Sequence, residues 1–209
     1  MCPLCRSKSI DVVGPLHGRD YFACERCVLV FMAPAQRLPA EAELAHYRTH
    51  RNDAYDPGYR AFLSRLADPL VERLTPGADG LDYGSGAARP LETMLEEQGF
   101  RMDSFDPFFH PSHELIERTY QFITCTETIE HFHDPDQEFE LLDRMLRPGG
   151  WLGVMTEVLQ PDQDFATWWY PRDPTHVCFY RAETLAWIAN HYGWRAEYPH
   201  PNVALFQKE

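Results

Sequence analysis

The sequence of 209 residues (24.3 kDa) is long enough for one α/β domain and a small additional segment. Its hydrophobic fraction of 44% is ordinary for a globular core, and no apolar run approaches the roughly 18 residues of a transmembrane helix. The formal net charge of −13 repels phosphate backbones and disfavours a general nucleic-acid binder. Because no targeting segment is evident after Met1, we expect a cytoplasmic protein without a membrane span.

The first thirty residues contain two Cys-x-x-Cys pairs, Cys2 with Cys5 and Cys24 with Cys27, and 18 residues lie between the pairs. This spacing is typical of a four-cysteine zinc ribbon, in which four thiolates complete a tetrahedral structural site. Metal binding of about 10–16 kcal/mol would stabilise a segment too small to fold alone. Two disulfides or redox-active pairs would also fit the spacing, but a cytoplasmic location disfavours both. Isolated Cys125 and Cys178 are expected to be buried thiols and not ligands.

The segment after the cysteines predicts a strand, a linker and two helices. An apolar run over 28–32 predicts the strand that completes the ribbon, and prolines follow it. A helix is expected over 40–50, and apolar residues at three- and four-residue spacing predict another between Phe62 and Leu74. Pro69 lies inside this second run, so we expect a kink there or a new helix capped by Asp68.

A nucleotide-binding βα unit is predicted around residues 80–99. A short apolar run ends in an acid, passes Gly84 and Gly86, and enters a helix that stops at Gly99. Glycines at such a turn let the backbone approach a ligand closely. A second strand, 100–105, then ends at Asp106, about 20 residues beyond the glycines, where an acid can bind both ribose hydroxyls.

The remainder of the chain predicts strands and helices in alternation, with one shortened unit. Only residues 108–120 precede the strand at 122–125, so a third strand with its helix does not fit comfortably there. A helix with Phe139 and Leu142 on its inner face, a turn at 147–150 and a strand at 151–157 follow. An aromatic-rich loop, a helix over 184–192 and a closing hairpin formed by 194–198 and 203–207 complete the chain.

The motifs occur in the order of a known family. Asp82-Tyr-Gly-Ser-Gly, then Asp106, then Glu130-His131 followed by Asp134-Pro, then Arg147-Pro-Gly-Gly resemble class I S-adenosylmethionine-dependent methyltransferases. The likeness covers about residues 78–209 and is greatest to the group of ubiquinone-biosynthesis O-methyltransferases and deoxysugar C-methyltransferases. Two departures are Ala88 in place of a glycine and Gln121 in place of an acid.

The resemblance implies an α/β fold with a Rossmann-like doubly wound sheet and a C-terminal antiparallel hairpin, over residues 79–209. The zinc ribbon (1–33) and a helical linker or lid (34–78) precede it. Tyr47, His50 and Tyr59 are candidates to face the site from the lid, although exposed positions are equally compatible with the sequence.

The resemblance also implies a cofactor site. The glycines would lie against the methionine and ribose portions, Asp82 near the ammonium end, Asp106 at the ribose diol and Thr126 on the adenosine side. The complete set of implied cofactor-binding residues is Asp82, Gly84, Ser85, Gly86, Asp106, Thr126 and Glu127.

Three further residues are catalytic candidates: His176, Glu130 and His131. His176 lies in an Asp-x-Thr-His-x-x-Phe motif resembling the family's substrate-side loop, and its neutral imidazole could act as general base or simply hydrogen-bond loop backbone. Glu127, Glu130 and His131 would share one face of a helical turn. In ubiquinone-pathway O-methyltransferases the matching residues hold a divalent ion, so Mg²⁺ is possible here, although a structural role for His131 is favoured.

The sequence therefore predicts an S-adenosylmethionine-dependent methyltransferase acting at oxygen or carbon of a small-molecule acceptor, with a histidine base. A different hypothesis is an RNA methyltransferase that grips RNA through the ribbon, which the acidic charge and the lack of an Asn-Pro-Pro-Tyr-like motif oppose. The sequence is also compatible with a nicotinamide-dependent reductase, although Arg89 occupies the place of its third glycine, and with a non-catalytic nucleoside-binding module.

Overall fold

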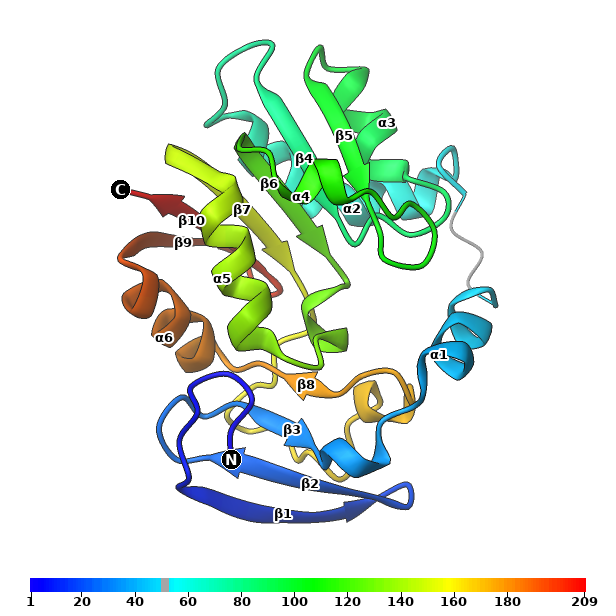
Figure 1. The fold of residues 1–209 in the computed structure, drawn as a ribbon, viewed down its shortest axis with the longest axis vertical. Coiled ribbons are helices and arrows are strands. Elements are labelled where there is room, and N and C mark those ends of the chain that lie inside the picture. The colour runs from blue at the N-terminus through cyan, green and yellow to red at the C-terminus, as the bar shows by residue number, and fades with distance from the viewer. Residues whose placement is uncertain (50–52) are drawn as a thin grey trace.

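The computed structural model describes residues 1–49 and 53–209, which form two β-sheets and the helices packed on them (Figure 1). The smaller sheet has the strand order β1-β2-β3-β8 and the larger β5-β4-β6-β7-β10-β9. The strands are β1 (Ile10–Leu16), β2 (Arg19–Cys24), β3 (Val30–Met32), β4 (Asp79–Tyr83), β5 (Arg101–Phe105), β6 (Tyr120–Thr126), β7 (Leu146–Met155), β8 (Cys178–Phe179), β9 (Trp194–His200) and β10 (Val203–Lys208).

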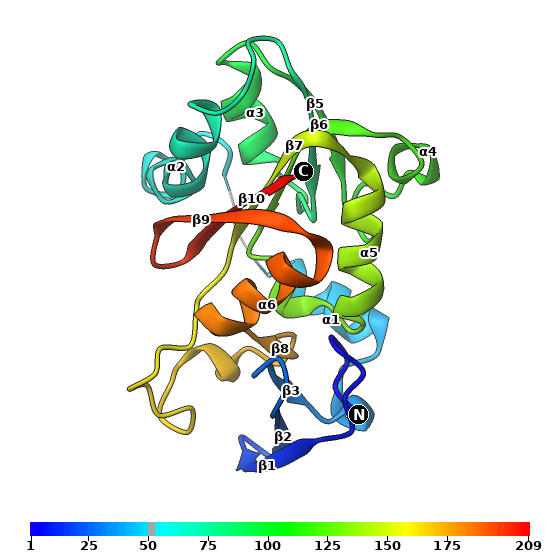
Figure 2. The same cartoon turned by 90° about the vertical axis from the view of Figure 1, so that its left-hand side faces the viewer.

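The larger sheet has the predicted doubly wound arrangement. Strands β5, β4, β6 and β7 are parallel, and the hairpin β9–β10 joins β7 in antiparallel fashion. Figure 2 shows the sheet between two helical layers, with α2 and α3 on one face and α5 on the other. The helices are α1 (Ala40–Tyr47), α2 (Pro57–Val71), α3 (Pro90–Glu96), α4 (His113–Ile116), α5 (Pro135–Met145) and α6 (Ala182–Tyr192). The predicted fold class is confirmed.

Alternation along the central strands builds a core on each face of this sheet. On β6, Phe122 packs with the α2 and α3 side chains, whereas Ile123 and Cys125 belong to the core on the opposite face. On β7, Met155 packs on the face covered by α2 and α3, and Val154 belongs to the core on the opposite face. Such alternation is the expected consequence of a pleated strand with both faces covered. No helix in the described ranges is both long and apolar enough to cross a bilayer.

One local prediction is confirmed and two need correction. Between β5 and β6 the structure has the four-residue helix α4 and, within the described residues, no strand, so β5 lies at the sheet edge. Pro69 neither starts a helix nor makes Asp68 a cap: α2 is one helix whose N-cap is Asp56, which accepts from the Tyr59 amide. The segment 147–150 is part of β7 instead of a turn before it.

The N-terminal sheet is completed by a strand from the C-terminal part of the chain. Val30 and Phe31 of β3 pair with Phe179 and Cys178 of β8. Tyr21, fully buried, packs its ring 5.1 Å from Phe165 and 5.8 Å from Phe179. The predicted boundary at residue 33 therefore separates segments that share one sheet and one hydrophobic core.

This shared core predicts that the two sheets unfold together. Replacing Tyr21 with Ala should lower the free energy of unfolding by about 3–5 kcal/mol, because a large aromatic ring is lost from a packed interior. Urea denaturation followed by far-UV circular dichroism and by tryptophan fluorescence should show one coincident transition. Val12→Ala is the control, since the Val12 side chain is exposed, and should change stability by less than about 0.5 kcal/mol. Separate transitions in the Tyr21 variant would contradict a shared core.

Candidate functional site

A cavity of about 520 Å³ opens at the carboxyl ends of β4, β5 and β6. In open α/β sheets ligands bind outside this edge, where loops leave the strands in different directions. The cavity is lined by every residue of the predicted cofactor set, namely Asp82, Gly84, Ser85, Gly86, Asp106, Thr126 and Glu127. The three catalytic candidates, Glu130, His131 and His176, line it as well. The fold thus brings all the predicted cofactor-binding and catalytic residues to one place.

The glycine turn after β4 forms one wall of the cavity. The amides of Gly84 and Ser85 both donate to the carbonyl of Phe105, which ties the turn to the end of β5. Gly84 has a φ of 79°, and a Cβ there would lie 2.2 Å from Cγ2 of Thr128. A side chain is therefore excluded by both the left-handed backbone and the close approach of the loop after β6.

Asp106 connects the turn to the end of β5. Its carboxylate accepts hydrogen bonds from the Gly86 amide (3.0 Å) and from the amides of Phe108 (2.8 Å) and Phe109 (3.0 Å). Asp82, at the end of β4, accepts from the Thr124 hydroxyl at 2.8 Å and is 2% exposed. Burial raises the pKa of Asp82 to about 7, so this acid is partly protonated at neutral pH.

Glu127 follows β6 in an unusual conformation. Its φ of 47° is in the left-handed region, and its amide donates to the Met155 carbonyl at 2.8 Å. The carboxyl group faces the cavity, and its buried Oε1 has no hydrogen-bond partner. Burial, and then the neighbouring Glu130 charge, raise the pKa of Glu127 to about 9.

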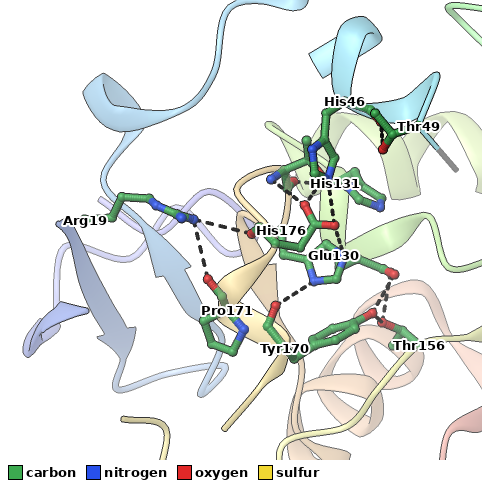
Figure 3. A network of polar contacts seen from close by, with 11 residues as sticks. Arg19, His46, Thr49, Glu130, His131, Thr156, Tyr170, Pro171 and His176 are labelled. Carbon is green, nitrogen blue, oxygen red and sulfur yellow. Dashed lines mark hydrogen bonds and ion pairs between the residues drawn. The ribbon is translucent and has the colours of Figure 1, made fainter. Parts of the chain in front are cut away.

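A polar network holds the catalytic candidates (Figure 3). Glu130 is fully buried and accepts hydrogen bonds from the Tyr170 hydroxyl (2.5 Å) and the Thr156 hydroxyl (2.9 Å). Nδ1 of His131 lies 3.0 Å from the Thr175 carbonyl, and Nδ1 of His176 lies 2.9 Å from the Tyr170 carbonyl. Because a carbonyl can only accept, each Nδ1 is protonated, and in the neutral rings each Nε2 retains its lone pair.

His176 presents a neutral imidazole to the cavity, although burial also weakens it as a base. The two histidine rings lie 4.9 Å apart, and His176 is 7% exposed. Burial lowers the pKa of His176 to about 4, against the raising effect of Glu130, so its imidazole is neutral at pH 7. The predicted hydrogen bond to loop backbone is also present, but it uses Nδ1 and leaves Nε2 available.

The predicted helical face of Glu127, Glu130 and His131 is wrong. Only Ile129–His131 forms a short 3-10 turn, and the left-handed backbone of Glu127 places this residue outside it. The potential metal ligands that do come together are Glu130, His131 and His176, whose ligand atoms lie within 4.8 Å of one another. The Glu127, Glu130 and His131 set proposed for Mg²⁺ therefore does not form one face.

Helix α1 covers the cavity and is attached to the rest of the site by two ionisable pairs. Glu43 accepts from His133 at 2.7 Å, and His46 lies 3.0 Å from Asp173. The Tyr47 ring of α1 packs edge-on to His131 with centroids 5.3 Å apart. Tyr47 and Tyr59 both line the cavity, in keeping with their candidacy, whereas His50 lies outside the described residues.

Sequence reasoning did not identify several residues of this network: Glu43, His46, Thr156 and Tyr170. Tyr170 lies 40 positions from Glu130 in the chain, and Glu43 lies 90 positions from His133. The only local signal was the aromatic-rich loop, whose run of tryptophan and tyrosine before Pro171 is visible in the sequence without indicating its contacts.

The four N-terminal cysteines form a separate cluster. Sγ of Cys2 lies 3.5 Å from Sγ of Cys27, and Sγ of Cys5 lies 3.4 Å from Sγ of Cys24. All four sulfurs lie within 4.8 Å of one another. A tetrahedral zinc site with Zn–S bonds of about 2.3 Å needs sulfurs about 3.8 Å apart, whereas a disulfide needs about 2.05 Å. The donor set and its spacing fit a zinc ion.

Known protein families give independent information about the domain that contains the cavity. A family model described as a methyltransferase domain matches residues 45–198. The chain belongs to this methyltransferase family. The match spans the sheet edge with the glycine turn, Asp106, Glu130 and His176, so the cavity lies within the methyltransferase domain. A search of curated proteins found no match.

Solved structures agree on the fold. A SAM-dependent methyltransferase from Aquifex aeolicus is 17% identical with a TM-score of 0.52, over 78% of this chain and 96% of that one. An O-methyltransferase family protein from Burkholderia thailandensis is 13% identical with a TM-score of 0.52, over 84% and 64%. Phosphoethanolamine N-methyltransferase 2 from Haemonchus contortus, solved with S-adenosyl-L-methionine, is 16% identical with a TM-score of 0.50, over 64% and 38%. The methyltransferase domain here thus has a class I methyltransferase fold.

The raised pKa of Asp82 predicts a specific dependence of stability on pH. The folded chain holds the Asp82 proton up to about pH 7, whereas the unfolded chain releases it near pH 4. The free energy of unfolding should therefore fall as the pH rises from about 4 to about 7, by at most about 4 kcal/mol from this group. Asp82→Asn removes the contribution, and the variant should gain stability relative to the parent chain across this range.

Urea denaturation at several pH values tests this, with the difference between the two chains as the measured quantity so that other groups cancel. Asp79→Asn is the matched control, because the Arg101 hydrogen bond lowers the pKa of Asp79, so its contribution changes mainly below about pH 4 and stays nearly constant from about pH 4 to 7. A difference between parent and Asp82 variant that does not change with pH would contradict the burial effect.

Proposed function

We propose that this chain transfers a methyl group from S-adenosylmethionine to a small-molecule acceptor. The observation that carries the proposal is the hydrogen bond between the Gly86 amide and the Asp106 carboxylate across the mouth of the cavity. It places a glycine turn and an acid at adjacent strand ends, the arrangement that binds a nucleoside. Membership of the methyltransferase family supports the same conclusion.

The residues at the sheet edge fit the cofactor. Asp106 would bind the ribose diol and Asp82 the ammonium end through water or backbone, while Gly84 and Gly86 let the backbone approach the ligand. Ser85, Thr126 and Glu127 complete the wall beside them. S-adenosylmethionine carries a sulfonium and an ammonium group, so its positive charges suit a cavity lined by acids.

S-adenosylmethionine supplies an already activated methyl group, so the protein has to orient the acceptor and receive one proton. We assign the proton to Nε2 of His176, the general base for an oxygen or carbon acceptor. Tyr170 holds this ring through its carbonyl and holds Glu130 through its hydroxyl. Glu130 and His131 would then orient the acceptor and His176 through this connected network.

We further propose a structural zinc ion bound by Cys2, Cys5, Cys24 and Cys27. The sulfur spacing supports it. The cysteines lie at the smaller sheet, which is completed by β8, and β8 follows His176 closely in the chain. The metal would stabilise the sheet that holds the proposed base, so it would act on catalysis only through position.

Titration calorimetry with S-adenosylhomocysteine, followed by screening small-molecule acceptors for its release, tests the function. His176→Asn should lower kcat by about 10²- to 10⁴-fold, the range for loss of a general base, without changing S-adenosylhomocysteine affinity. His191→Asn is the matched control, because His191 stacks on Trp187 in α6 outside the cavity. A folded, metal-loaded chain that does not bind S-adenosylmethionine would be a binding module without turnover, and full activity in the His176 variant would refute the base.

Metal analysis tests the zinc proposal. The purified chain should contain one zinc ion per molecule, and Cys27→Ser should lose it together with much of the thermal stability. Cys125→Ala is the control, because Cys125 is buried in β6 away from the cluster and should leave the zinc content unchanged. A metal-free chain with the parent's melting temperature would contradict a structural zinc site.

A further inference from the structure

The cavity is lined by more acidic side chains than the cofactor accounts for. Its lining includes three histidines and no lysine or arginine among the described residues. Two of its acids, Asp82 and Asp106, have proposed contacts with the cofactor, Glu127 lies in the wall beside them, and three others lie elsewhere in the lining. The six acids that line the cavity are Glu43, Asp82, Asp106, Glu127, Glu130 and Glu138.

Most of these acids are held by partners within the protein. Glu138 accepts from the Tyr83 hydroxyl at 2.5 Å, Glu43 pairs with a histidine, and Glu130 has its two hydroxyl donors. Asp82 and Asp106 also have donors. Glu127 differs, because its buried Oε1 has no hydrogen-bond partner. A buried carboxyl oxygen without a donor is costly, so this atom points to a donor that a ligand would supply.

Aromatic rings also line the cavity. Tyr59 and Phe62 are stacked with centroids 6.1 Å apart, and Tyr47 packs 5.5 Å from Phe108. All four rings line the cavity. Burial, followed by the charges of Asp82 and Glu127, raises the pKa of Tyr59 to about 12, which places Tyr59 close to both acids.

Arg65, whose positive charge acts on Glu127, does not supply the missing hydrogen bond. Arg65 contributes a favourable charge to Glu127, but it is exposed, does not line the cavity and lies 5.1 Å from the centroid of Phe62. Aromatic faces combined with a carboxylate are the chemical setting that binds an organic ammonium group.

We propose that the methyl acceptor is a small organic amine, bound as its ammonium form by Glu127 Oε1 against the aromatic rings of α1 and α2. This inference rests on the proposed function, since it names the acceptor class of the same cavity. The methylated atom is then an oxygen or carbon elsewhere in the acceptor, because an ammonium nitrogen has no lone pair with which to attack the methyl group. A bound cation favours the ionised form of Glu127, so the raised pKa of this group should fall when the acceptor binds.

The same acids disfavour anionic acceptors. A phosphate or carboxylate inside the cavity would lose its hydration and meet carboxylates, with no lysine or arginine among the described lining residues to compensate. A nucleotide-sugar acceptor, whose diphosphate carries two negative charges, is therefore disfavoured, although the resemblance to deoxysugar C-methyltransferases suggested one.

Three probes of similar size and different charge test the proposal: 2-phenylethylamine, 2-phenylethanol and 3-phenylpropanoate. Their binding to the full chain saturated with S-adenosylhomocysteine is measured by titration calorimetry near neutral pH. The amine should bind at least about tenfold more tightly than the alcohol, and the carboxylate should bind more weakly than both.

Three variants locate the effect. Glu127→Gln should weaken amine binding by about ten- to a hundredfold and leave alcohol binding unchanged, because only the charged hydrogen bond is removed. Glu157→Gln is the matched control: it removes the same charge close to Glu127 from a residue outside the cavity lining, and it should leave the amine preference intact. Glu127→Asp keeps the charge and should retain part of the preference.

The outcomes separate this inference from the proposed function. If S-adenosylhomocysteine does not bind the parent chain, the methyltransferase proposal itself fails. If it binds, equal or better binding of the alcohol or carboxylate, or no binding of the amine at millimolar concentration, overturns the amine acceptor. An unchanged amine preference in the Glu127→Gln variant overturns the role of Glu127, as does loss of S-adenosylhomocysteine affinity there, which would assign the residue to the cofactor.

Discussion

The pairing of β3 with β8 fixes the position of the proposed base. The Met32 amide donates to the Val177 carbonyl at 2.9 Å, and the Val177 amide donates to the Glu130 carbonyl at 2.8 Å. Residue 177 is thus held between the N-terminal sheet and the turn that carries Glu130. His176, its neighbour, cannot move far without breaking both bonds, and Arg19 supports the same loop through the Pro171 and Asp173 carbonyls (Figure 3).

This arrangement gives the N-terminal segment a role in geometry. Arg6, in the loop after the first cysteine pair, forms ion pairs with Asp134 (2.5 Å) and Asp136 (2.7 Å) at the start of α5. The N-terminal segment therefore contacts the site loop through β3 and the helix after Glu130 through Arg6. A cysteine cluster that holds both contacts in place can influence the position of His176 without touching a substrate.

What could be predicted from the sequence was local. The glycine turn, Asp106, the cysteine spacing, the shortened segment after β5 and the closing hairpin each depend on contiguous residues whose backbone preferences are strong. The contacts of Tyr170 with Glu130 and of β8 with β3 depend on tertiary packing between distant segments, so no periodicity reveals them. The helical face of Glu127, Glu130 and His131 failed because spacing assumes a regular backbone, and the left-handed φ of Glu127 interrupts it.

The buried acids of this site act in opposite directions on the stability of the folded chain and on the binding of a positively charged ligand. Burial raises the pKa values of Asp82 and Glu127, so the folded chain stabilises their neutral forms at a cost to their charged ones. A ligand that carries positive charge reverses this balance, because it stabilises the carboxylates and releases their protons. Binding of such a ligand is therefore linked to proton release and should strengthen as the pH rises through the range in which these acids titrate. Acids that destabilise the folded chain on their own would thus favour a ligand of positive charge.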